Sequence, residues 1–322
     1  MGRRVIAGAL ILGEVVMLLL VVAIGLITFA GAETAPTMTL TVFIETATIT
    51  RLGSTVRVAG HSGNGLRSGD TVATGPNGKA AIAYPDGSTT RLDSSTTVTV
   101  SSRHGQGQTV QTSFQQSAGL TWNRVQKLVG VSSFKVSGPN SATAEVRGTE
   151  FGYYVERDPS GAPVIWIDTW SGSVLVGGTG GSVLAGAGQR VTVRAGVPPT
   201  TPVPIPAGDR QLSFTVFNET LNALTGKPVA FASGTISTGA SSQSFPVQAD
   251  GTSDLQFVLG WPGSIYELTI TDPAGNVVSR TASSVPPLSV VVPKAAAGTW
   301  LFAVRDVQSA PGEAWWVIVG RS

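Results

Sequence analysis

Short runs of alternating apolar and polar residues, separated by tight turns, fill most of the chain after one long apolar run at its start. In residues 71–101, for example, Val98 and Val100 alternate with threonines, and Asn-Gly at 77–78 and Asp-Gly at 86–87 separate the runs. A period of two is typical of half-buried strands, and these dipeptides favour tight turns because they tolerate positive φ. We therefore predict an all-β protein after an N-terminal helix.

The long apolar run, residues 5–30, is interrupted only by Glu14 and Thr28. A helix rises about 1.5 Å per residue and the hydrocarbon core of a bilayer is about 30 Å thick, so roughly 20 residues span it. We expect a transmembrane signal-anchor helix over residues 5–31. Because a carboxylate at the bilayer centre is costly, Glu14 either lies near the cytoplasmic headgroups or contacts a partner protein inside the membrane.

The residues that flank this run predict its orientation. Arg3 and Arg4 precede it, which favours a cytoplasmic N-terminus. A cytoplasmic stub of residues 1–4 then leaves everything after the helix outside the cytoplasm of a bacterial cell, on a single-pass anchor. The small residues at 30–32 also fit a signal-peptide cleavage site, although the run exceeds the usual apolar segment of about 7–15 residues. Both interpretations export the remaining chain.

Composition excludes several kinds of chemistry. The net charge of +2, with no cluster of Lys or Arg, gives no footprint for nucleic acid. The chain has no cysteine, which excludes disulfides, thiolate catalysis and iron–sulfur ligation. Two histidines, His61 and His104, are too few to predict a zinc site or a catalytic triad. No phosphate-binding loop, dinucleotide fingerprint or nucleophile elbow occurs, so we expect no enzyme activity, no cofactor and no metal.

Two ordered motif blocks carry a resemblance to a known family. The first reads Leu66-Arg67-Ser68-Gly69-Asp70-Thr71-Val72-Ala73-Thr74-Gly75, followed by Gly78, Ala80, Ile82 and Asp86-Gly87-Ser88. The second contains Gly119-Leu120-Thr121-Trp122, Phe134-Lys135-Val136, Ala144-Glu145-Val146-Arg147-Gly148-Thr149-Glu150-Phe151 and Val174-Leu175-Val176, then Gly186, Gln189 and Val191. Residues 46–196 therefore resemble a FecR domain.

The resemblance implies a β-rich extracytoplasmic module of the kind found in envelope sensors. In the iron-uptake regulators of this family, the module relays a signal from an outer-membrane transporter to a cytoplasmic sigma factor. Those proteins carry a sizeable cytoplasmic segment before the membrane helix. The stub of residues 1–4 is too short for an anti-sigma domain, so we do not expect direct regulation of a sigma factor.

Beyond the FecR-like region, the pattern predicts a linker and a second β domain. A juxtamembrane segment of residues 32–45 precedes the FecR-like region. Residues 197–207 have proline at about every second position, which is typical of an extended polyproline spacer. Residues 208–322 return to alternation, beginning with a predicted strand around residues 212–217, and predict an antiparallel β-sandwich.

A few residues are candidates for ligand or partner contacts. Trp166 and Trp170 lie on one face of a predicted strand, opposite Ile165 and Ile167. If the isoleucines face the core, the tryptophans form a platform for sugars or peptides; if the tryptophans face it, they are ordinary packing. Arg147 either binds a carboxylate ligand or pairs with Glu145 or Asp70.

The leading functional hypothesis is a non-catalytic, membrane-anchored binding or scaffold protein of the bacterial envelope, with an envelope protein or a glycan as its partner. The first alternative is a signal transducer that acts through a membrane partner contacted by Glu14. The second alternative is a secreted hydrolase, because two acids that flank a cleft would leave no sequence motif.

Overall fold

The computed structural model describes residues 38–104, 110–126, 132–310 and 312–322, which belong to one compact unit, Thr37–Ser322. The predicted stub, the transmembrane helix at 5–31 and Glu14 lie outside the described residues. Within the described ranges, no helix combines the length and the apolar character needed to cross a bilayer. The described chain is rich in β-strands, as the alternation predicted.

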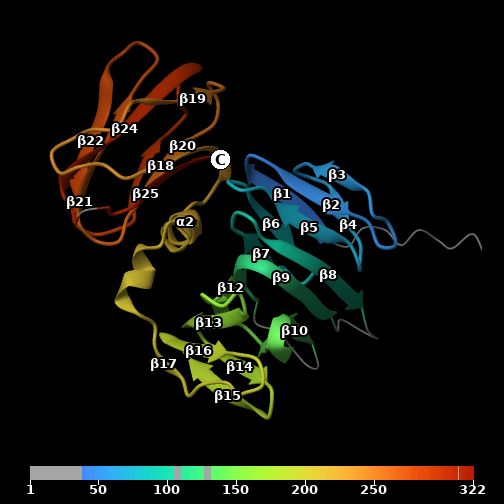
Figure 1. Ribbon diagram of the computed structural model, residues 1–322. Coiled ribbons are helices and arrows are strands. Elements are labelled where there is room, and N and C mark those ends of the chain that lie inside the picture. Colours follow the sequence, from blue (N-terminus) through green and yellow to red (C-terminus); the bar gives the residue numbers. More distant parts are fainter. Residues whose placement is uncertain (1–37, 105–109, 127–131, 311) are drawn as a thin grey trace, which may run out of the picture. The chain divides into compact units, whose positions relative to one another are not determined.

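The first part of the chain folds into two sheets, called here the N-terminal sandwich (Figure 1). Sheet A has the order β4 (Gly65–Leu66), β1 (Met38–Ile44), β6 (Lys79–Ala83), β7 (Thr89–Leu92), β9 (Val110–Arg124), β12 (Glu150–Arg157), β13 (Pro163–Ser171), β16 (Gln189–Val193) and β17 (Val203–Pro204). Sheet B has the order β3 (Arg57–Gly60), β2 (Ala47–Thr50), β5 (Thr71–Thr74), β8 (Thr97–His104), β9, β10 (Ser133–Ser137), β11 (Thr143–Val146), β14 (Ser173–Gly178) and β15 (Gly181–Gly186). One apolar core fills the space between the two sheets.

Strand β9 belongs to both sheets because it bends at Gly119. Its first part pairs with β8 and β10, and its last part pairs with β7 and β12. Gly119 has φ +80°, and a Cβ there would lie 2.3 Å from the Thr96 hydroxyl oxygen. Thr96 cannot easily move, because this hydroxyl donates to the Leu120 carbonyl (3.1 Å) and accepts from the Leu120 amide (3.0 Å). Glycine is therefore the residue that fits this bend.

Gly148 of the second motif block has a similar place in the fold. Its φ is +114°, and it lies between β11 in sheet B and β12 in sheet A. The short run around Gly148 therefore carries the chain from one sheet to the other. The motif glycine has an architectural role, in keeping with its position between strands.

The second part of the chain forms the C-terminal sandwich, which has two antiparallel sheets of four strands. One sheet has the order β18 (Lys227–Gly234), β25 (Trp315–Arg321), β20 (Leu255–Gly260) and β23 (Leu288–Val292). The other has the order β19 (Phe245–Ala249), β24 (Gly298–Gln308), β21 (Ile265–Thr271) and β22 (Val277–Ser283). A separate apolar core lies between them.

The structure corrects the prediction of a strand around residues 212–217. Two short 3-10 turns, η1 (Pro139–Ser141) and η2 (Ala207–Gln211), occur in the described chain, and η2 leads into an α-helix, α2 (Ser213–Asn222). Alternation suggested a strand because the helix is buried on more than one side. Buried apolar residues therefore occur at strand spacing as well as at helix spacing in this segment.

The segments assigned to spacers also form part of the sheets. β1 lies inside residues 32–45 and contributes Met38 and Leu40 to the core. β17 lies inside the proline-rich residues 197–207 and pairs with β16, with Val203 opposite Arg190. Proline is tolerated there because β17 is an edge strand. Part of the predicted extended spacer thus pairs with sheet A.

The bend at Gly119 gives the first prediction. Gly119→Ala combines an unfavourable φ with a clash against Thr96, and should lower the free energy of unfolding by about 2–4 kcal/mol in urea denaturation. Gly161→Ala is the matched control, because Gly161 has φ +85° but a Cβ added there would meet no atom within 4 Å. It should cost about 1 kcal/mol. Equal costs for the two variants would show that the bend is not tightly packed.

Candidate functional site

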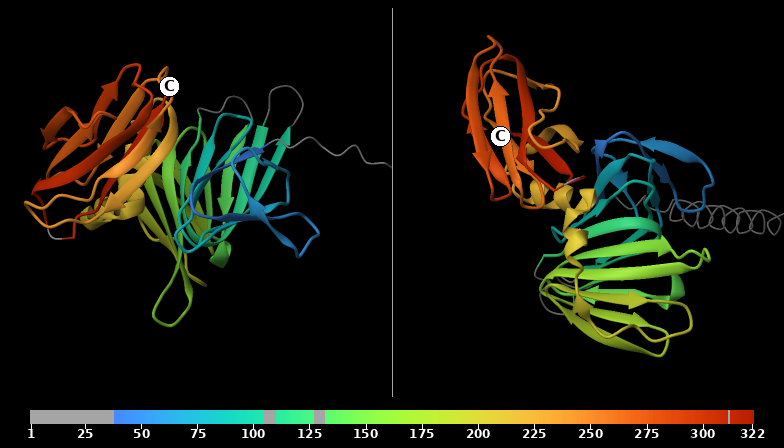
Figure 2. Two further views of the ribbon diagram at one scale, coloured as in Figure 1. Left: turned by 90° about the horizontal axis from the view of Figure 1, so that it is seen from above. Right: turned by 60° about the vertical axis from the view of Figure 1, so that its left-hand side comes forward.

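Helix α2 lies between the two sandwiches and packs against both (Figures 1 and 2). One cluster of buried apolar side chains joins α2 to sheet A and to β25. Its buried members are Trp122, Phe214, Val216, Phe217, Leu221, Trp316 and Ile318, and we call this cluster the α2 junction. Consecutive tryptophans on β25 are explained by it, since Trp315 faces the core of the C-terminal sandwich and Trp316 faces α2.

Phe217 is the centre of the α2 junction. Its ring centroid lies 6.0 Å from that of Phe43 on β1, 6.2 Å from that of Phe231 on β18, and 5.0 Å from that of Trp316 on β25. Edge-to-face and tilted pairs at these distances are favourable beyond the area they bury. A single helix side chain therefore contacts strands from both sandwiches.

A buried lysine adds charge to this aromatic cluster. Lys79 on β6 is only 8% exposed and forms an ion pair with Asp93. Its ammonium also lies 5.1 Å from the Phe214 ring centroid and 5.6 Å from that of Trp316. The ammonium is therefore compensated both by a carboxylate and by ring faces.

Polar contacts connect one side of α2 with sheet A. Arg91 on β7 donates from Nη1 to the backbone oxygen and to Oδ1 of Asn218, both at 3.2 Å. Glu150 on β12 accepts from Trp122 Nε1 (2.6 Å) and from Asn222 Nδ2 (2.7 Å) with the same oxygen. Asn218 and Asn222 are four residues apart, so both face sheet A.

Burial and a neighbouring carboxylate change the pKa of Arg91 in opposite directions. Burial lowers the pKa of Arg91 to about 10, while the nearby Glu150 carboxylate opposes this change. The guanidinium thus remains charged near neutral pH, inside a contact from which water is largely excluded. Because a buried guanidinium without acceptors is costly, Arg91 must keep its hydrogen bonds to Asn218. These bonds hold α2 against sheet A.

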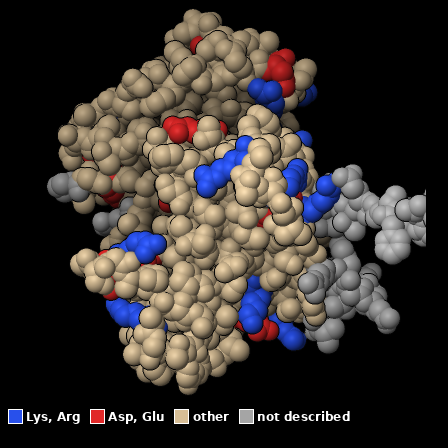
Figure 3. Space-filling model, turned by 45° about the vertical axis from the view of Figure 1, so that its right-hand side comes forward, with Lys and Arg blue, Asp and Glu red and all other residues tan. Residues whose placement is uncertain are grey.

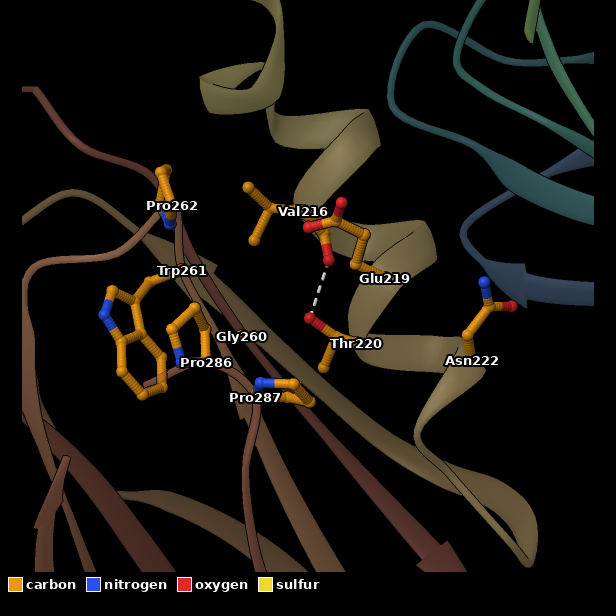
Figure 4. A pocket seen from close by; sticks show the side chains of 9 residues that line it. All are labelled: Val216, Glu219, Thr220, Asn222, Gly260, Trp261, Pro262, Pro286 and Pro287. Carbon is orange, nitrogen blue, oxygen red and sulfur yellow. Dashed lines mark hydrogen bonds between the residues drawn. The ribbon is translucent and has the colours of Figure 1, made fainter. Parts of the chain in front are cut away.

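A pocket of about 390 Å³ lies beside α2, on its side toward the C-terminal sandwich (Figure 4). Its walls combine the helix with the ends and loops of neighbouring strands. The lining residues are Val216, Glu219, Thr220, Asn222, Gly260, Trp261, Pro262, Pro286 and Pro287. The volume falls within the usual range of about 300–1,000 Å³ for small-molecule sites.

The pocket offers hydrogen-bond acceptors more than donors. Thr220 Oγ1 donates to the Val216 carbonyl (2.6 Å), and Trp261 Nε1 donates to the Ser264 carbonyl (2.8 Å). Glu219 is the ionisable side chain among the described lining residues. The lining therefore suits a ligand that donates hydrogen bonds and carries positive charge.

The candidate tryptophans occupy the outer face of sheet A, since Ile165 and Ile167 belong to the core between the sheets. Trp170 stacks on Trp122, with ring centroids 5.0 Å apart and an angle of 17° between planes, and packs against the α2 junction. Trp166 is half-buried, and the Arg190 guanidinium lies 5.0 Å from its ring centroid. Neither forms the open platform that was one of the two alternatives.

Arg190 is fixed from two sides. It donates two hydrogen bonds to Asp168, from Nε and Nη2, each at 2.6 Å, and it forms an ion pair with Asp209 of η2. Burial raises the pKa of Asp168, although the Arg190 contact opposes this change. This group attaches the segment before α2 to the outer face of sheet A.

The other sequence candidates lie elsewhere. Arg147 is exposed at the bend between β11 and β12, and Asp70, one of its expected partners, pairs with Arg51 (Nη1 to Oδ2, 2.5 Å). Glu14 lies outside the described residues. Sequence reasoning missed the pocket and the α2 junction. Phe214, Phe217 and Leu221 recur at helix spacing, and that period was the signal that would have revealed them.

The surface carries few charges outside these contacts. Figure 3 shows Lys, Arg, Asp and Glu scattered singly or in small groups over one face of the molecule, between wide uncharged areas. Among the residues that the structure describes, no three His, Cys, Asp or Glu side chains gather in one place. The pocket beside α2 is therefore the candidate site with the clearest chemistry.

Comparisons with known proteins place one part of the chain in a family. Residues 70–175 match the model of the family described as FecR protein. No curated protein matches the chain. The match lies inside the region that the motifs identified and confirms that resemblance.

Solved structures add weak similarities. Two crystal structures of a proposed anti-sigma factor from Parabacteroides distasonis share 13% and 14% identity, with TM-scores of 0.38 and 0.36; each match covers 46% of this chain and 64% of that chain. The SGBP-B protein of a Bacteroides ovatus mixed-linkage glucan utilization locus, in complex with a mixed-linkage heptasaccharide, shares 10% identity at a TM-score of 0.22; it covers 91% of this chain and 90% of that chain. None of these scores defines a common fold.

The Glu150 contact gives the second prediction. Glu150→Ala leaves the Trp122 and Asn222 donors without their acceptor, and should lower the free energy of unfolding by about 1–3 kcal/mol. Glu145→Ala, at an exposed position on β11, should change it by less than about 0.5 kcal/mol. A double-mutant cycle with Asn222→Ala should show a coupling of at least about 0.5 kcal/mol. Strict additivity would mean that this bond does not hold α2.

Proposed function

We propose, from the FecR domain that residues 70–175 form, that this chain is a non-catalytic binding protein of the bacterial envelope. In this proposal the C-terminal sandwich and α2 receive a ligand, and the FecR domain is the module to which they are attached. The long apolar run at residues 5–30 would anchor the chain in the cell membrane, with its bulk outside the cytoplasm.

The observation that carries the proposal is the double role of α2. The helix binds sheet A through Asn218 and Asn222, and it contributes Val216, Glu219, Thr220 and again Asn222 to the lining of the pocket. A ligand in the pocket would therefore touch the same ten-residue helix that the FecR domain holds. This arrangement suits a protein that presents a bound ligand or partner in a fixed relation to its FecR domain.

The chemistry of the lining specifies a class of ligand. Apolar contacts come from Val216 and from the rings of Pro262, Pro286 and Pro287, and the negative charge comes from Glu219. An ammonium group on an aliphatic stem matches both, with the stem against the prolines and the charge at the carboxylate. We assign the pocket to such a group, as on a lysine side chain of a partner or on a free alkylamine.

This assignment gives the third prediction. The full-length protein in detergent should bind pentylamine more tightly than pentan-1-ol, which has the same stem without the charge, in NMR titrations. Glu219→Gln should weaken amine binding about tenfold and leave the alcohol unchanged, because a charge-assisted hydrogen bond is worth about 1.5–3 kcal/mol.

Controls make this result specific to the pocket. Glu145→Gln removes an exposed carboxylate from the N-terminal sandwich and should leave amine binding unchanged. An acetylated lysine methylamide would test whether the site accepts a peptide side chain as well as a free amine. Equal binding of amine and alcohol, or no effect of Glu219→Gln, would contradict the proposed ligand class.

A second candidate function is signal transduction through a membrane partner. Glu14 inside the apolar run favours it, because a carboxylate in a membrane helix often marks a polar partner. The fourth prediction separates the two functions by crosslinking in native membranes. If the protein is a transducer, Glu14→Leu should remove a membrane-protein adduct that Thr28→Val retains. If it is a scaffold, both variants should give the adducts of the unaltered protein.

A further inference from the structure

A small hollow lies on the outer face of the C-terminal sandwich, over strands β21, β22 and β24 (Figure 1). Its volume is about 210 Å³, below the usual range of about 300–1,000 Å³ for small-molecule sites. The hollow therefore suits one charged group of a larger ligand. Its lining includes Ser241, Glu267, Thr269, Arg280, Ala303 and Arg305.

The strand register explains why a hollow forms there. Thr269 on β21 lies opposite Arg280 on β22 and opposite Ala303 on β24. These three residues form a row across the sheet and face away from the core, to which the alternate residues Leu268 and Ile270 belong. Cβ atoms of cross-strand partners are about 4.5–5.5 Å apart, so the short side chains of Thr269 and Ala303 leave a space between longer neighbours.

One wall of the hollow carries an arginine in a fixed orientation. Arg305 lies opposite Glu267 and donates to it twice, from Nε to Oε1 (3.0 Å) and from Nη2 to Oε2 (3.1 Å). These bonds hold the pKa of Glu267 below its usual range, although burial opposes them, so Glu267 is ionised near neutral pH. A guanidinium has more N–H donors than this pair uses, and Arg305 therefore keeps donors for a ligand.

Arg280 supplies the second guanidinium of the hollow. It is exposed on β22, and it forms no hydrogen bond or ion pair with the residues that the structure describes. The described lining thus holds two arginines and one glutamate, and Glu267 already pairs with Arg305. One positive charge therefore remains without a carboxylate partner at the hollow.

A carboxylate matches this lining in charge and in shape. Guanidinium groups bind planar carboxylates through paired N–H donors. A carboxylate also brings the single negative charge that the lining lacks, whereas a phosphate monoester carries about 1.5–2 negative charges at pH 7. The hydroxyl groups of Ser241 and Thr269 both donate and accept, which suits a ligand that carries hydroxyl groups beside its acid.

We propose that this hollow binds the carboxylate of an acidic sugar, with Arg280 and Arg305 on the carboxylate and Thr269 beside the sugar ring. The site is separate from the pocket beside α2, since the two share no lining residue. It would give the protein a contact for acidic polysaccharide on the outer face of the C-terminal sandwich, whatever ligand the pocket beside α2 receives.

NMR titration of the isotope-labelled full-length protein in detergent tests this fifth prediction. At constant ionic strength, glucuronate should shift the amides of Thr269, Arg280 and Ala303. It should bind at least tenfold more tightly than glucose, which has the same ring without the carboxylate. Acetate, which lacks the ring, and glucose 6-phosphate, which carries more charge than the lining neutralises, should both bind more weakly than glucuronate. Equal or tighter binding of either would overturn the assignment to an acidic sugar.

Variants assign the response to the hollow. Arg280→Gln should weaken glucuronate binding about tenfold. Arg57→Gln, which removes an exposed arginine from the N-terminal sandwich, should leave it unchanged. Ala303→Leu keeps every charge in place and should weaken binding to a similar extent because the larger side chain fills the hollow. Glu219→Gln should have no effect, so the outcome here is independent of the ligand assigned to the pocket beside α2.

Three results would overturn the proposal. The first is no binding of glucuronate by the unaltered protein. The second is a loss of binding in Arg57→Gln as large as that in Arg280→Gln, which would indicate attraction by overall charge. The third is full binding in both Arg280→Gln and Ala303→Leu, which would place the ligand elsewhere.

Discussion

The packing of α2 against two sheets at once is the constraint on which the arrangement of the described chain depends. A helix of ten residues is too short to be stable alone in water, so tertiary contacts must hold it. Phe217 supplies them in both directions, toward Phe43 of the N-terminal sandwich and toward Trp316 of the C-terminal sandwich. The helix and the contact between the sandwiches therefore form together, because each provides the apolar surface that the other buries.

The polar contacts of α2 give this packing a defined register. Arg91 and Glu150 of sheet A bind asparagines one turn apart, which fixes the rotation of the helix about its axis. That rotation turns Glu219 toward the pocket and Thr220 toward Gly260, where a side chain in place of the glycine would collide with the Thr220 hydroxyl at 1.8 Å. Glu150 belongs to a FecR motif block and binds Asn222 of α2, and α2 also lines the pocket. A residue of the family motif and the pocket are therefore in contact with the same helix.

The strands and the FecR domain were predictable from sequence because alternation and turn dipeptides are local signals, as at Val98 and Val100. Helix α2 was not, because Leu212, Phe214 and Val216 alternate like a strand while Phe214, Phe217 and Leu221 follow a helix. Burial on both sides made the two periods overlap. The pairing of Tyr266 with Asp306 lay beyond sequence reasoning, since only the contact of β21 with β24 brings residues 40 positions apart together.

Hydrogen exchange on Phe217→Ala tests most directly whether α2 joins the two sandwiches into one unit. The account predicts faster amide exchange in α2, in residues 119–124 of β9 and in β25 together. Phe245→Ala, in the core of the C-terminal sandwich, should instead leave β9 unchanged, since Phe245 packs on Phe302 and Trp315. Faster exchange confined to α2 in Phe217→Ala, with β9 and β25 both unaffected, would contradict the account.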